Sequence, residues 1–325
     1  MSVLNILFVG SDEVARSIAK KSDSRDVDNY IYKDLKEGGL FSTISILRPN
    51  NYPDKPKPFF TSLTVSDFGI IEVNKVDGSF GEVIVSMASA GIKEGLVLIN
   101  PSEGEWVDDS QVKTLLKQAG LSNWEFIEND GVLIREKLIE VLNQIKPNDD
   151  DGFVVAVDQA FTVKGVGLVA IGHVQSGKVN KHDELILAGS EGNAIARSLQ
   201  VMDLDVDVAN VGDRVGLAMR TAGPFREDLL GKGSILADSN ERFAVESNSK
   251  FELNKAAFQK NDLVAGDVVH LCSDLQFVVG RISEISDCVH INWDFPIVLN
   301  KSSKRNPLIV QLEATPRIMG FAKFK

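Results

Sequence analysis

The stretch DQAFTVKGVGLVAIGHVQSG, residues 158–177, holds two strand-like runs that are separated by Gly165 and Gly167. These glycines permit a tight hairpin between the two runs, and Gly177 lets the chain turn again after the second. The alternating apolar residues from Val169 onward supply side chains for one closed interior. The stretch therefore predicts neighbouring strands of a small β-barrel.

The same pattern of short strands and glycine turns continues on both sides of this stretch. No long helical pattern interrupts it, so we expect residues 151–240 to form one all-β barrel domain. Residues 241–249 are interpreted as a connection, and the strand-rich remainder predicts a second β-barrel at 246–325. The expected strands of the first barrel are FVVAVDQAF, GVGLVAIGHV, DELILAG, AIARSLQVM, RVGLAMR and SILADS.

Residues 1–148 differ, because strand-like and helix-like segments alternate there. Apolar runs such as LNILFVG, DFGIIEV and GLVLIN are each followed by a segment with helical spacing. This alternation is typical of parallel β-α units, so we expect an α/β domain with a doubly wound, mostly parallel sheet. The polar, turn-rich KPNDDDG at 146–152 marks the expected domain boundary.

Composition narrows the class of protein further. The 325 residues carry a formal net charge of −11, with two cysteines that lack CxxC spacing and four histidines, which argues against a zinc site. The acidic total does not favour non-specific binding to nucleic acid, and we expect no DNA partner, although a local basic face matters more than the total. No apolar run of about 18 residues and no secretory leader occur, so we expect a cytoplasmic protein without a membrane partner.

The segment GSDEVARS, residues 10–17, follows the first expected strand and precedes a helical pattern. A nucleotide phosphate loop has the form G-x-x-x-x-G-K-[ST], with backbone amides around the phosphates and the hydroxyl on magnesium. Gly10 and Ser17 match the first and last positions of this motif, whereas Ala15 replaces the second glycine and Arg16 replaces the lysine. GTP with Mg²⁺ is therefore a candidate cofactor at these four residues, with Ser17 as the metal ligand. The alternative is an ordinary first strand and helix of an α/β domain.

Two segments compete for the role of the guanine-binding motif. Asn74-Lys75-Val76-Asp77 matches N-K-x-D literally but follows too early a strand, and we interpret it as a turn. Asn100-Pro101-Ser102-Glu103 follows the strand where the motif belongs, so Asn100 and Glu103 are the candidate base contacts. The D-x-x-G magnesium motif is missing, since Arg48-Pro49-Asn50-Asn51 stands in its place. No catalytic residue is predicted, and the sequence leaves open whether the protein is an enzyme.

Several strings in the central segment resemble, in order, the second domain of elongation factor Tu and its relatives. Residues 197–201, RSLQV, are more similar to the selenocysteine-specific branch than to elongation factor Tu itself. The short first domain resembles the pyrrolysine-associated, selenocysteine-factor-like proteins of archaea. The strings that carry the first resemblance are 158–167, 169–177, Asp183-Glu184, 211–216 and 226–229, and those that carry the last are Lys36-Glu37-Gly38, Tyr52-Pro53, Ser66-Asp67 and Trp124-Glu125.

The resemblance implies a P-loop GTPase-like α/β domain followed by two all-β barrels, and a protein that binds aminoacyl-tRNA across all three domains. Val201 stands where elongation factor Tu has a glutamate that faces the terminal adenine. The histidine that follows D-x-x-G in the family has no counterpart here. By position, the residues that would border the pocket for the terminal nucleotide of the tRNA are His173, Gln200, Val201, Met202 and Arg214.

Three functions follow as hypotheses. The leading one is an elongation-factor-like, tRNA-binding protein of protein synthesis, in effect a pseudo-GTPase with weak or absent GTP binding and hydrolysis. The second is a working GTP-binding elongation factor with an atypical phosphate loop. The third is a nucleotide-independent module that binds the ribosome or another protein through its barrels.

Overall fold

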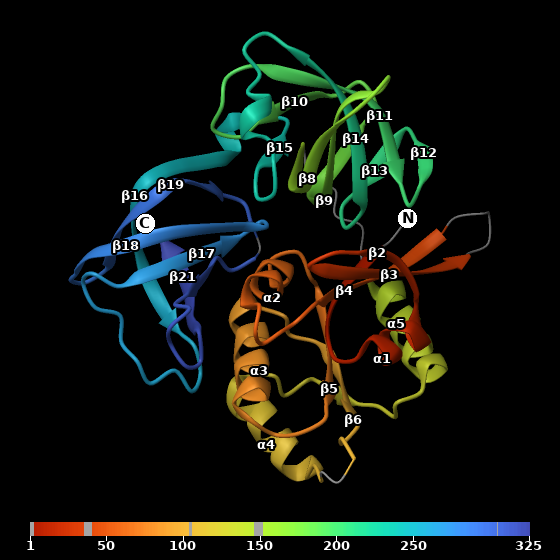
Figure 1. The fold of residues 1–325 in the computed structure, drawn as a ribbon, viewed down its shortest axis with the longest axis vertical. Coiled ribbons are helices and arrows are strands. Elements are labelled where there is room, and N and C mark those ends of the chain that lie inside the picture. Colours follow the sequence, from red (N-terminus) through yellow and green to blue (C-terminus); the bar gives the residue numbers. More distant parts are fainter. Residues whose placement is uncertain (1–2, 36–40, 104–105, 146–151, 304) are drawn as a thin grey trace.

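The computed structural model describes residues 3–35, 41–103, 106–145, 152–303 and 305–325. Its strands form three sheets, which separate into three regions in Figure 1. We call these regions domain 1, from β1 (Val3–Val9) to α5 (Gly131–Gln144), domain 2, from β8 (Phe153–Val163) to β15 (Ile235–Ala237), and domain 3, from β16 (Phe243–Lys255) to β21 (Ile318–Phe324). The string at 36–38 and most of the boundary expected at 146–152 lie outside the described residues. The domain limits drawn from the sequence stay predictions.

Domain 1 is built on one mixed, mostly parallel sheet. Besides β1, its strands are β2 (Lys20–Ser24), β3 (Val27–Leu35), β4 (Phe41–Pro49), β5 (Phe68–Val73), β6 (Gly95–Ile99) and β7 (Glu125–Phe126). They lie in the order β2-β3-β4-β1-β5-β6-β7. The strands from β4 to β7 in this order run parallel, and β2 and β3 add an antiparallel hairpin at one edge. The predicted fold class of this region is confirmed.

Helices cover both faces of this sheet. Besides α5, they are α1 (Asp12–Ile18), α2 (Pro56–Leu63), α3 (Gly78–Ala90) and α4 (Asp109–Ala119). Ile6 and Phe8 of β1 pack with α1 and α5, whereas Leu7 packs with α2, α3 and α4 on the opposite face. Because successive residues of a strand point to opposite faces, this short apolar strand contributes side chains to the hydrophobic cores on both faces of the sheet.

The β2–β3 hairpin was not predicted from the sequence. The helical spacing of residues 12–21 led us to expect a longer first helix, but α1 ends at Ile18 and Lys20 begins β2. Arg135 of α5 donates to the backbone oxygens of Ser17 at 2.5 Å and Ile18 at 3.1 Å. These bonds satisfy carbonyls that the last helical turn leaves free, so a tertiary contact fixes the end of the helix.

Domain 2 is a closed β-barrel, as the central stretch predicted. Its strands besides β8 and β15 are β9 (Gly167–Asn180), β10 (Glu184–Leu187), β11 (Asn193–Val201), β12 (Leu204–Val206), β13 (Val208–Asn210) and β14 (Arg214–Ala222), with a 3-10 turn η1 (Glu227–Leu229). β10 pairs with both β15 and β11, so the ring β10-β15-β8-β9-β14-β11 closes on itself. Gly165 and Gly167, in the turn between β8 and β9, have φ values of 84° and 100°.

Domain 3 is a second closed barrel, in the order β16-β19-β18-β17-β20-β21. Its remaining elements are η2 (Asn240–Arg242), β17 (Val268–Ser273), β18 (Gln276–Ile285), β19 (Val289–Asn300) and β20 (Leu308–Val310). The expectation that 241–249 forms a connection is wrong for most of that segment. β16 already begins at Phe243, which pairs with Asn300 of β19.

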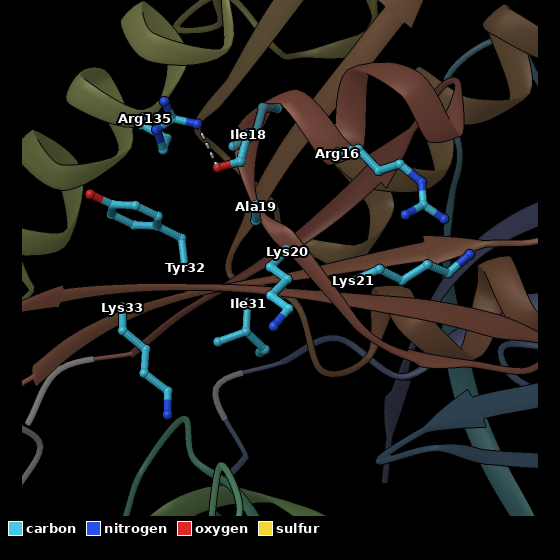
Figure 2. Close-up of a pocket in the computed structure, with 9 residues that line it drawn as sticks. All are labelled: Arg16, Ile18, Ala19, Lys20, Lys21, Ile31, Tyr32, Lys33 and Arg135. Carbon is cyan, nitrogen blue, oxygen red and sulfur yellow. Dashed lines mark hydrogen bonds between the residues drawn. The ribbon is translucent and has the colours of Figure 1, made fainter.

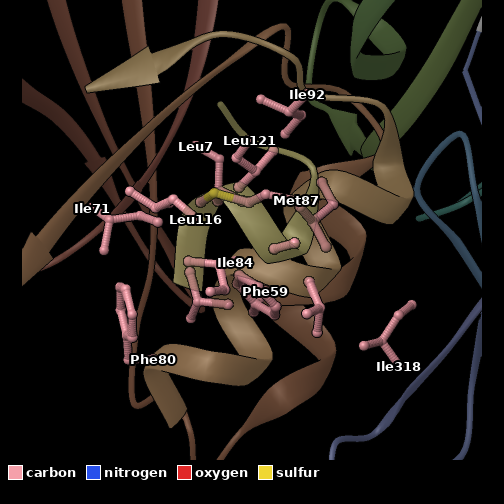
Figure 3. Close-up of a cluster of buried hydrophobic side chains, with 14 of the residues drawn as sticks. Leu7, Phe59, Ile71, Phe80, Ile84, Met87, Ile92, Leu116, Leu121 and Ile318 are labelled. Atoms are coloured by element: carbon pink, nitrogen blue, oxygen red, sulfur yellow. The ribbon is translucent and has the colours of Figure 1, made fainter. Parts of the chain in front are cut away.

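One hydrophobic cluster runs from domain 1 into domain 3 (Figure 3). Phe59, Ile84 and Met87 of domain 1 are fully buried in it, and so is Ile318 of β21. The other members from domain 3 are Ala256, Cys272, Leu308 and Val310. An interface of this kind is as apolar as a domain core, so domains 1 and 3 form one packed body rather than two mobile ones.

Buried polar contacts reinforce the same interface. The backbone N–H of Arg317 donates to the carboxylate of Glu82 at 2.6 Å, and the Arg317 guanidinium donates to it at 3.1 Å. Glu82 is only 7% exposed, so this partner is needed to keep its charge in the interior. Arg305 of domain 3 donates to Asp67 of domain 1 at 2.7 Å. Domain 3 thus holds one orientation against the helices α2 and α3.

We predict that Gly95→Ala destabilises the protein, because a Cβ at position 95 would lie 2.6 Å from the ring of Trp124 and from the backbone oxygen of Gly69. The expected loss is about 1–3 kcal/mol of unfolding free energy, measured by urea denaturation. Gly81→Ala is the matched control, because its Cβ meets nothing within 4 Å and it lies inside α3. That variant should gain about 0.5–1 kcal/mol. Equal stability of the two variants would contradict the packing.

Candidate functional site

The turn after β1, where the phosphate loop is predicted, is short and closely packed. Only Gly10 and Ser11 separate β1 from α1, and the Ser11 hydroxyl caps the helix by accepting from the Val14 N–H at 3.2 Å. A Cβ at Gly10 would lie 2.6 Å from Phe8 and 2.7 Å from Glu72, so the backbone is closely packed there. The backbone oxygen of Gly10 accepts from Arg48 Nε at 2.7 Å.

A buried carboxylate occupies the space in front of this turn. Glu72, near the end of β5, accepts the Ser11 N–H at 2.5 Å through one oxygen and the Asn100 side-chain amide at 2.6 Å through the other. Glu72 is 6% exposed. In a working phosphate loop, backbone amides at this point of the fold are free for the nucleotide. Here the backbone N–H of Ser11 already donates to Glu72, an anionic side chain of the protein itself.

The other residues of the predicted phosphate motif lie within α1. Ala15 is fully buried, Arg16 pairs with Asp12 of the same helix, and the Ser17 hydroxyl donates to the Val14 backbone oxygen at 2.8 Å. Ser17 therefore lies in the last turn of the helix instead of its first. The description of these residues as GTP and Mg²⁺ ligands stays a prediction. Among the described residues, no group of three or more His, Cys, Asp or Glu side chains is arranged to hold a metal ion.

The two candidate guanine motifs meet at one polar cavity. A cavity of about 500 Å³ at the ends of β1, β5 and β6 is lined by Ser11, Glu13, Val14, Ser17, Glu72, Asn74, Asn100, Asn129 and Gly131. Asn74 donates to the backbone oxygen of Asn100 at 3.0 Å, and Asp77 caps α3. Glu103 is exposed and does not line this cavity. The walls carry two carboxylates and no cation, which is the wrong charge for a polyphosphate.

A larger cavity lies between domains 1 and 2. It measures about 760 Å³ and is lined from domain 1 by β2 and β3 and from domain 2 by β9, β11, the turn that follows it and β14. Gln200, Met202 and Arg214, which the resemblance selected, line it, whereas His173 and Val201 do not. The full lining is Lys20, Lys21, Ser22, Asp23, Asn29, Ile31, Lys33, Ile171, Gln200, Met202, Asp203, Arg214 and Gly216.

A network of charged side chains closes one side of this cavity. Arg25 and Asp23 of domain 1 meet Asp158 and Arg214 of domain 2, with Arg25–Asp158 at 3.1 Å and Arg214–Asp23 at 3.3 Å. Arg214 also pairs with Asp158 at 3.2 Å. Burial alone raises the pKa of Asp158, but Lys232 and Arg214 outweigh it and lower the pKa to about 2. The network therefore stays charged at neutral pH and joins the two domains.

His173 is buried behind this network. It pairs with Arg214 across the β9–β14 ladder and is 3% exposed. Burial, followed by the charge of Arg214, lowers the pKa of His173 to about 4, so the ring is neutral at physiological pH. Its Nδ1 has no hydrogen-bond partner among the residues that the structure describes. Val201 is also buried, at 6% exposure, and belongs to the core of the barrel.

Sequence reasoning missed several residues that shape these cavities. Glu72 carried a usable signal, since it is an acid inside the otherwise apolar strand FGIIEV. Arg48 was noted only as a departure from D-x-x-G, although it ties the Gly10 turn to Asp28. Asp23 and Arg25 lie in the unpredicted hairpin, so no sequence pattern pointed to them.

Comparisons with known proteins agree with the fold. No protein-family model matches the chain. Translation elongation factor SelB of Methanococcus maripaludis, in its apo form, has a TM-score of 0.78 and 18% identity, covering 100% of this chain and 80% of that one. A bacterial selenocysteine-specific elongation factor, EF-Sec, has a TM-score of 0.76 and 16% identity, covering 100% of this chain and 58% of that one. In sequence, the selenocysteine-specific elongation factor of Escherichia coli is 32% identical over 216 residues, which are 62% of this chain and 34% of that protein.

Fold and sequence together define a translation-elongation-factor-like protein, and the chain belongs to the translational GTPase-like family. Within that family it matches the uncharacterized protein MJ0325 of Methanocaldococcus jannaschii over most of both chains. The two are 30% identical over 281 residues, which are 86% of each. The predicted family and the predicted series of one α/β domain and two barrels are confirmed. Among the described residues, no helix combines the length and apolar character needed to cross a membrane.

We predict that replacing Glu72 by methionine costs about 1–3 kcal/mol of unfolding free energy, because the Ser11 N–H and the Asn100 amide would lose their shared acceptor in a buried place. Urea denaturation measures this. Glu13→Gln, an exposed carboxylate of the same cavity, should change stability by less than about 0.5 kcal/mol. A Glu72→Met protein as stable as the parent would refute the role of the carboxylate.

We also predict a pH dependence from His173. The pKa of its ring is about 4 in the folded chain against the ordinary value of 6.5, so the neutral form is favoured by folding. This contribution is fully present above pH 6.5 and is lost as the pH falls toward 4. Between pH 7.5 and 5 the parent should lose about 2 kcal/mol relative to His173→Gln, which does not titrate. A stability difference that is constant with pH would contradict the burial of a neutral ring.

Proposed function

We propose that this protein binds the aminoacylated end of a tRNA in the cavity between domains 1 and 2, and that it does so without bound GTP. The proposal assigns the chain to protein synthesis as a tRNA-binding, elongation-factor-like protein. The observation that carries it is the cavity of about 760 Å³, whose walls come from both domains and include Gln200, Met202 and Arg214.

The chemistry of the cavity supports an RNA end as the ligand. Lys20 and Lys33 offer cations, Gln200 offers an amide, and Ile31 and Ile171 offer apolar surface for a base or an aminoacyl group. Small-molecule sites combine apolar walls with a few polar groups in this way. The names of the relatives point in the same direction, since they are selenocysteine-specific elongation factors.

The crevice around Glu72 supports independence from nucleotide. Its carboxylate holds the Ser11 amide, and the remaining wall of that cavity carries no cation. In addition, domain 1 already contacts domain 2 through the Arg25–Asp158 pair and through Asn5, which donates to the Gly212 backbone oxygen at 2.8 Å. The arrangement that encloses the interdomain cavity thus needs no triphosphate to hold it. Ribosome binding, an earlier alternative, stays a prediction.

The test is binding of fluorescent aminoacyl-tRNA and deacylated tRNA to the purified chain, without nucleotide and then with GTP and Mg²⁺. We expect aminoacyl-tRNA to bind tighter than about 10 μM, with no change on adding GTP. Absence of binding to either tRNA would reject the proposal, and binding only after GTP is added would reject its nucleotide-free form.

A variant that fills the cavity tests the location. Gly216 lines the cavity on β14, and a Cβ there would meet only Gln200, at 3.8 Å, so a side chain can extend into the open space. Gly216→Phe should weaken aminoacyl-tRNA binding by about tenfold or more. Ala222→Phe, at the exposed end of the same strand, is the matched control and should bind as the parent does. Equal affinities of the two variants would place the RNA end elsewhere.

A further inference from the structure

A basic groove lies on the outer edge of domain 1, next to the interdomain cavity. It measures about 430 Å³ and is lined by Arg16, Ile18, Ala19, Lys20, Lys21, Ile31, Tyr32, Lys33 and Arg135 (Figure 2). Five of these nine residues are cations and none is an acid. The protein carries a net charge of −11, so this positively charged groove is opposite in sign to the chain as a whole.

Three of the cations have no carboxylate partner among the described residues. Arg16 pairs with Asp12, and Lys21 pairs with Asp12 and Asp28. Lys20 and Lys33 are exposed and make no ion pair in the described part of the chain. Arg135 bonds only to the backbone oxygens of Ser17 and Ile18 there, which leave its charge uncompensated. Their combined field attracts an anion.

The groove also offers an aromatic face. The Arg135 guanidinium lies 5.5 Å from the centroid of the Tyr32 ring, which is half-buried beside it. In Figure 2, Tyr32 and Arg135 lie on one side of the hairpin, while Lys20 and Lys33 extend from the other. Cations along a groove together with an aromatic side chain are typical of surfaces that bind single-stranded nucleic acid.

The groove and the interdomain cavity are continuous. Lys20, Lys21, Ile31 and Lys33 line both of them. β2, which supplies Lys20 and Lys21, is the outermost strand of the seven-stranded sheet, so no further strand of the described chain covers its outer edge. A chain that leaves the cavity can therefore pass over β2 and reach Arg135 without crossing a layer of protein.

We infer that this groove binds the phosphodiester backbone of the single-stranded RNA segment that leads into the interdomain cavity, with Lys20, Lys33 and Arg135 contacting phosphates and Tyr32 contacting a base or ribose. The inference rests on the proposed function, because the cavity supplies the anchored end of that RNA. It adds a path for the strand outside the cavity.

The simpler account of Lys20 is that a lysine on an edge strand prevents pairing with another sheet. That account explains charge on β2 but does not explain Lys33 of β3 or Arg135 of α5. It also does not explain why the acids near the groove are already paired with Arg16 and Lys21. Cations from β2, β3 and α5 lie on both sides of this exposed edge, which favours a ligand that passes over it.

The experiment compares Arg135→Gln, which removes a cation that lines the groove but not the interdomain cavity, with Lys117→Gln, at an exposed lysine that lines neither. Both variants remove one charge, and circular dichroism with urea denaturation checks that each protein folds. Binding of fluorescent aminoacyl-tRNA is measured from about 50 to 400 mM salt, where about 0.7 units of log–log slope correspond to each phosphate contact of a single strand. We expect Arg135→Gln to lower the slope by about 0.7 and the affinity by about 5-fold at about 0.1 M salt.

A second arm replaces the tRNA by an aminoacylated adenosine, which keeps the end anchored in the cavity and lacks the strand outside it. Arg135→Gln should bind this ligand as the parent does, because nothing then crosses the groove. Parental affinity and salt slope of Arg135→Gln for aminoacyl-tRNA would overturn the inference and leave the proposed function intact. An equal effect of this variant on both ligands would also overturn it, since Arg135 would then act on the cavity itself. If the parent chain binds no tRNA, the proposed function and this inference fail together.

Discussion

The carboxylate of Glu72 is the constraint on which the rest of domain 1 depends. It lies in the interior and joins the turn after β1 to the residue that follows β6. A buried charge is tolerable only when its oxygens are bonded, and here backbone and side-chain amides supply those bonds. The anionic group that organises this crevice is therefore a side chain of the protein. In a nucleotide-binding protein, a phosphate of the nucleotide would take this place. A polyphosphate would have to approach an anion that is already in place.

Contacts between side chains and backbone of the protein itself also join the three domains. In a nucleotide switch, the ligand decides how the first domain meets the others. In this chain, Arg48 fixes the Gly10 turn, and fixed contacts then join domain 1 to both barrels. The apolar cluster around Ile318 contributes buried contact area between domains 1 and 3, and the ion pairs fix how the domains are oriented. The interdomain cavity is thus part of a preformed scaffold, which lowers the ordering cost of binding.

The sequence specified the architecture better than the site. The parallel sheet and both barrels could be predicted, since apolar periodicity and glycine turns are local signals that survive in a single chain. The β2–β3 hairpin could not, because its polar strands lack a buried face of their own and Arg135, far away in the chain, decides where α1 ends. Residues 10–17 matched the phosphate motif only in the spacing of Gly10 and Ser17. In the structure, Ser17 lies in the last turn of α1, at the other end of the helix from the Gly10 turn. Gln200, Met202 and Arg214, which the resemblance selected, line the large cavity, whereas Lys20 and Lys33 depend on a tertiary edge that no short motif encodes.

The shared apolar cluster of domains 1 and 3 has a consequence for synthesis. The ribosome releases Phe59 and Met87 early, but Leu308 and Ile318, which complete their packing, lie near the other end of the chain. At the usual 5–20 residues per second, domain 1 waits roughly 10–30 seconds for these partners after its own last helix has been made. During that interval its helices α2 and α3 expose apolar surface that only the final barrel can cover. The nascent chain is therefore a natural client for chaperones until the last strands of domain 3 have been made.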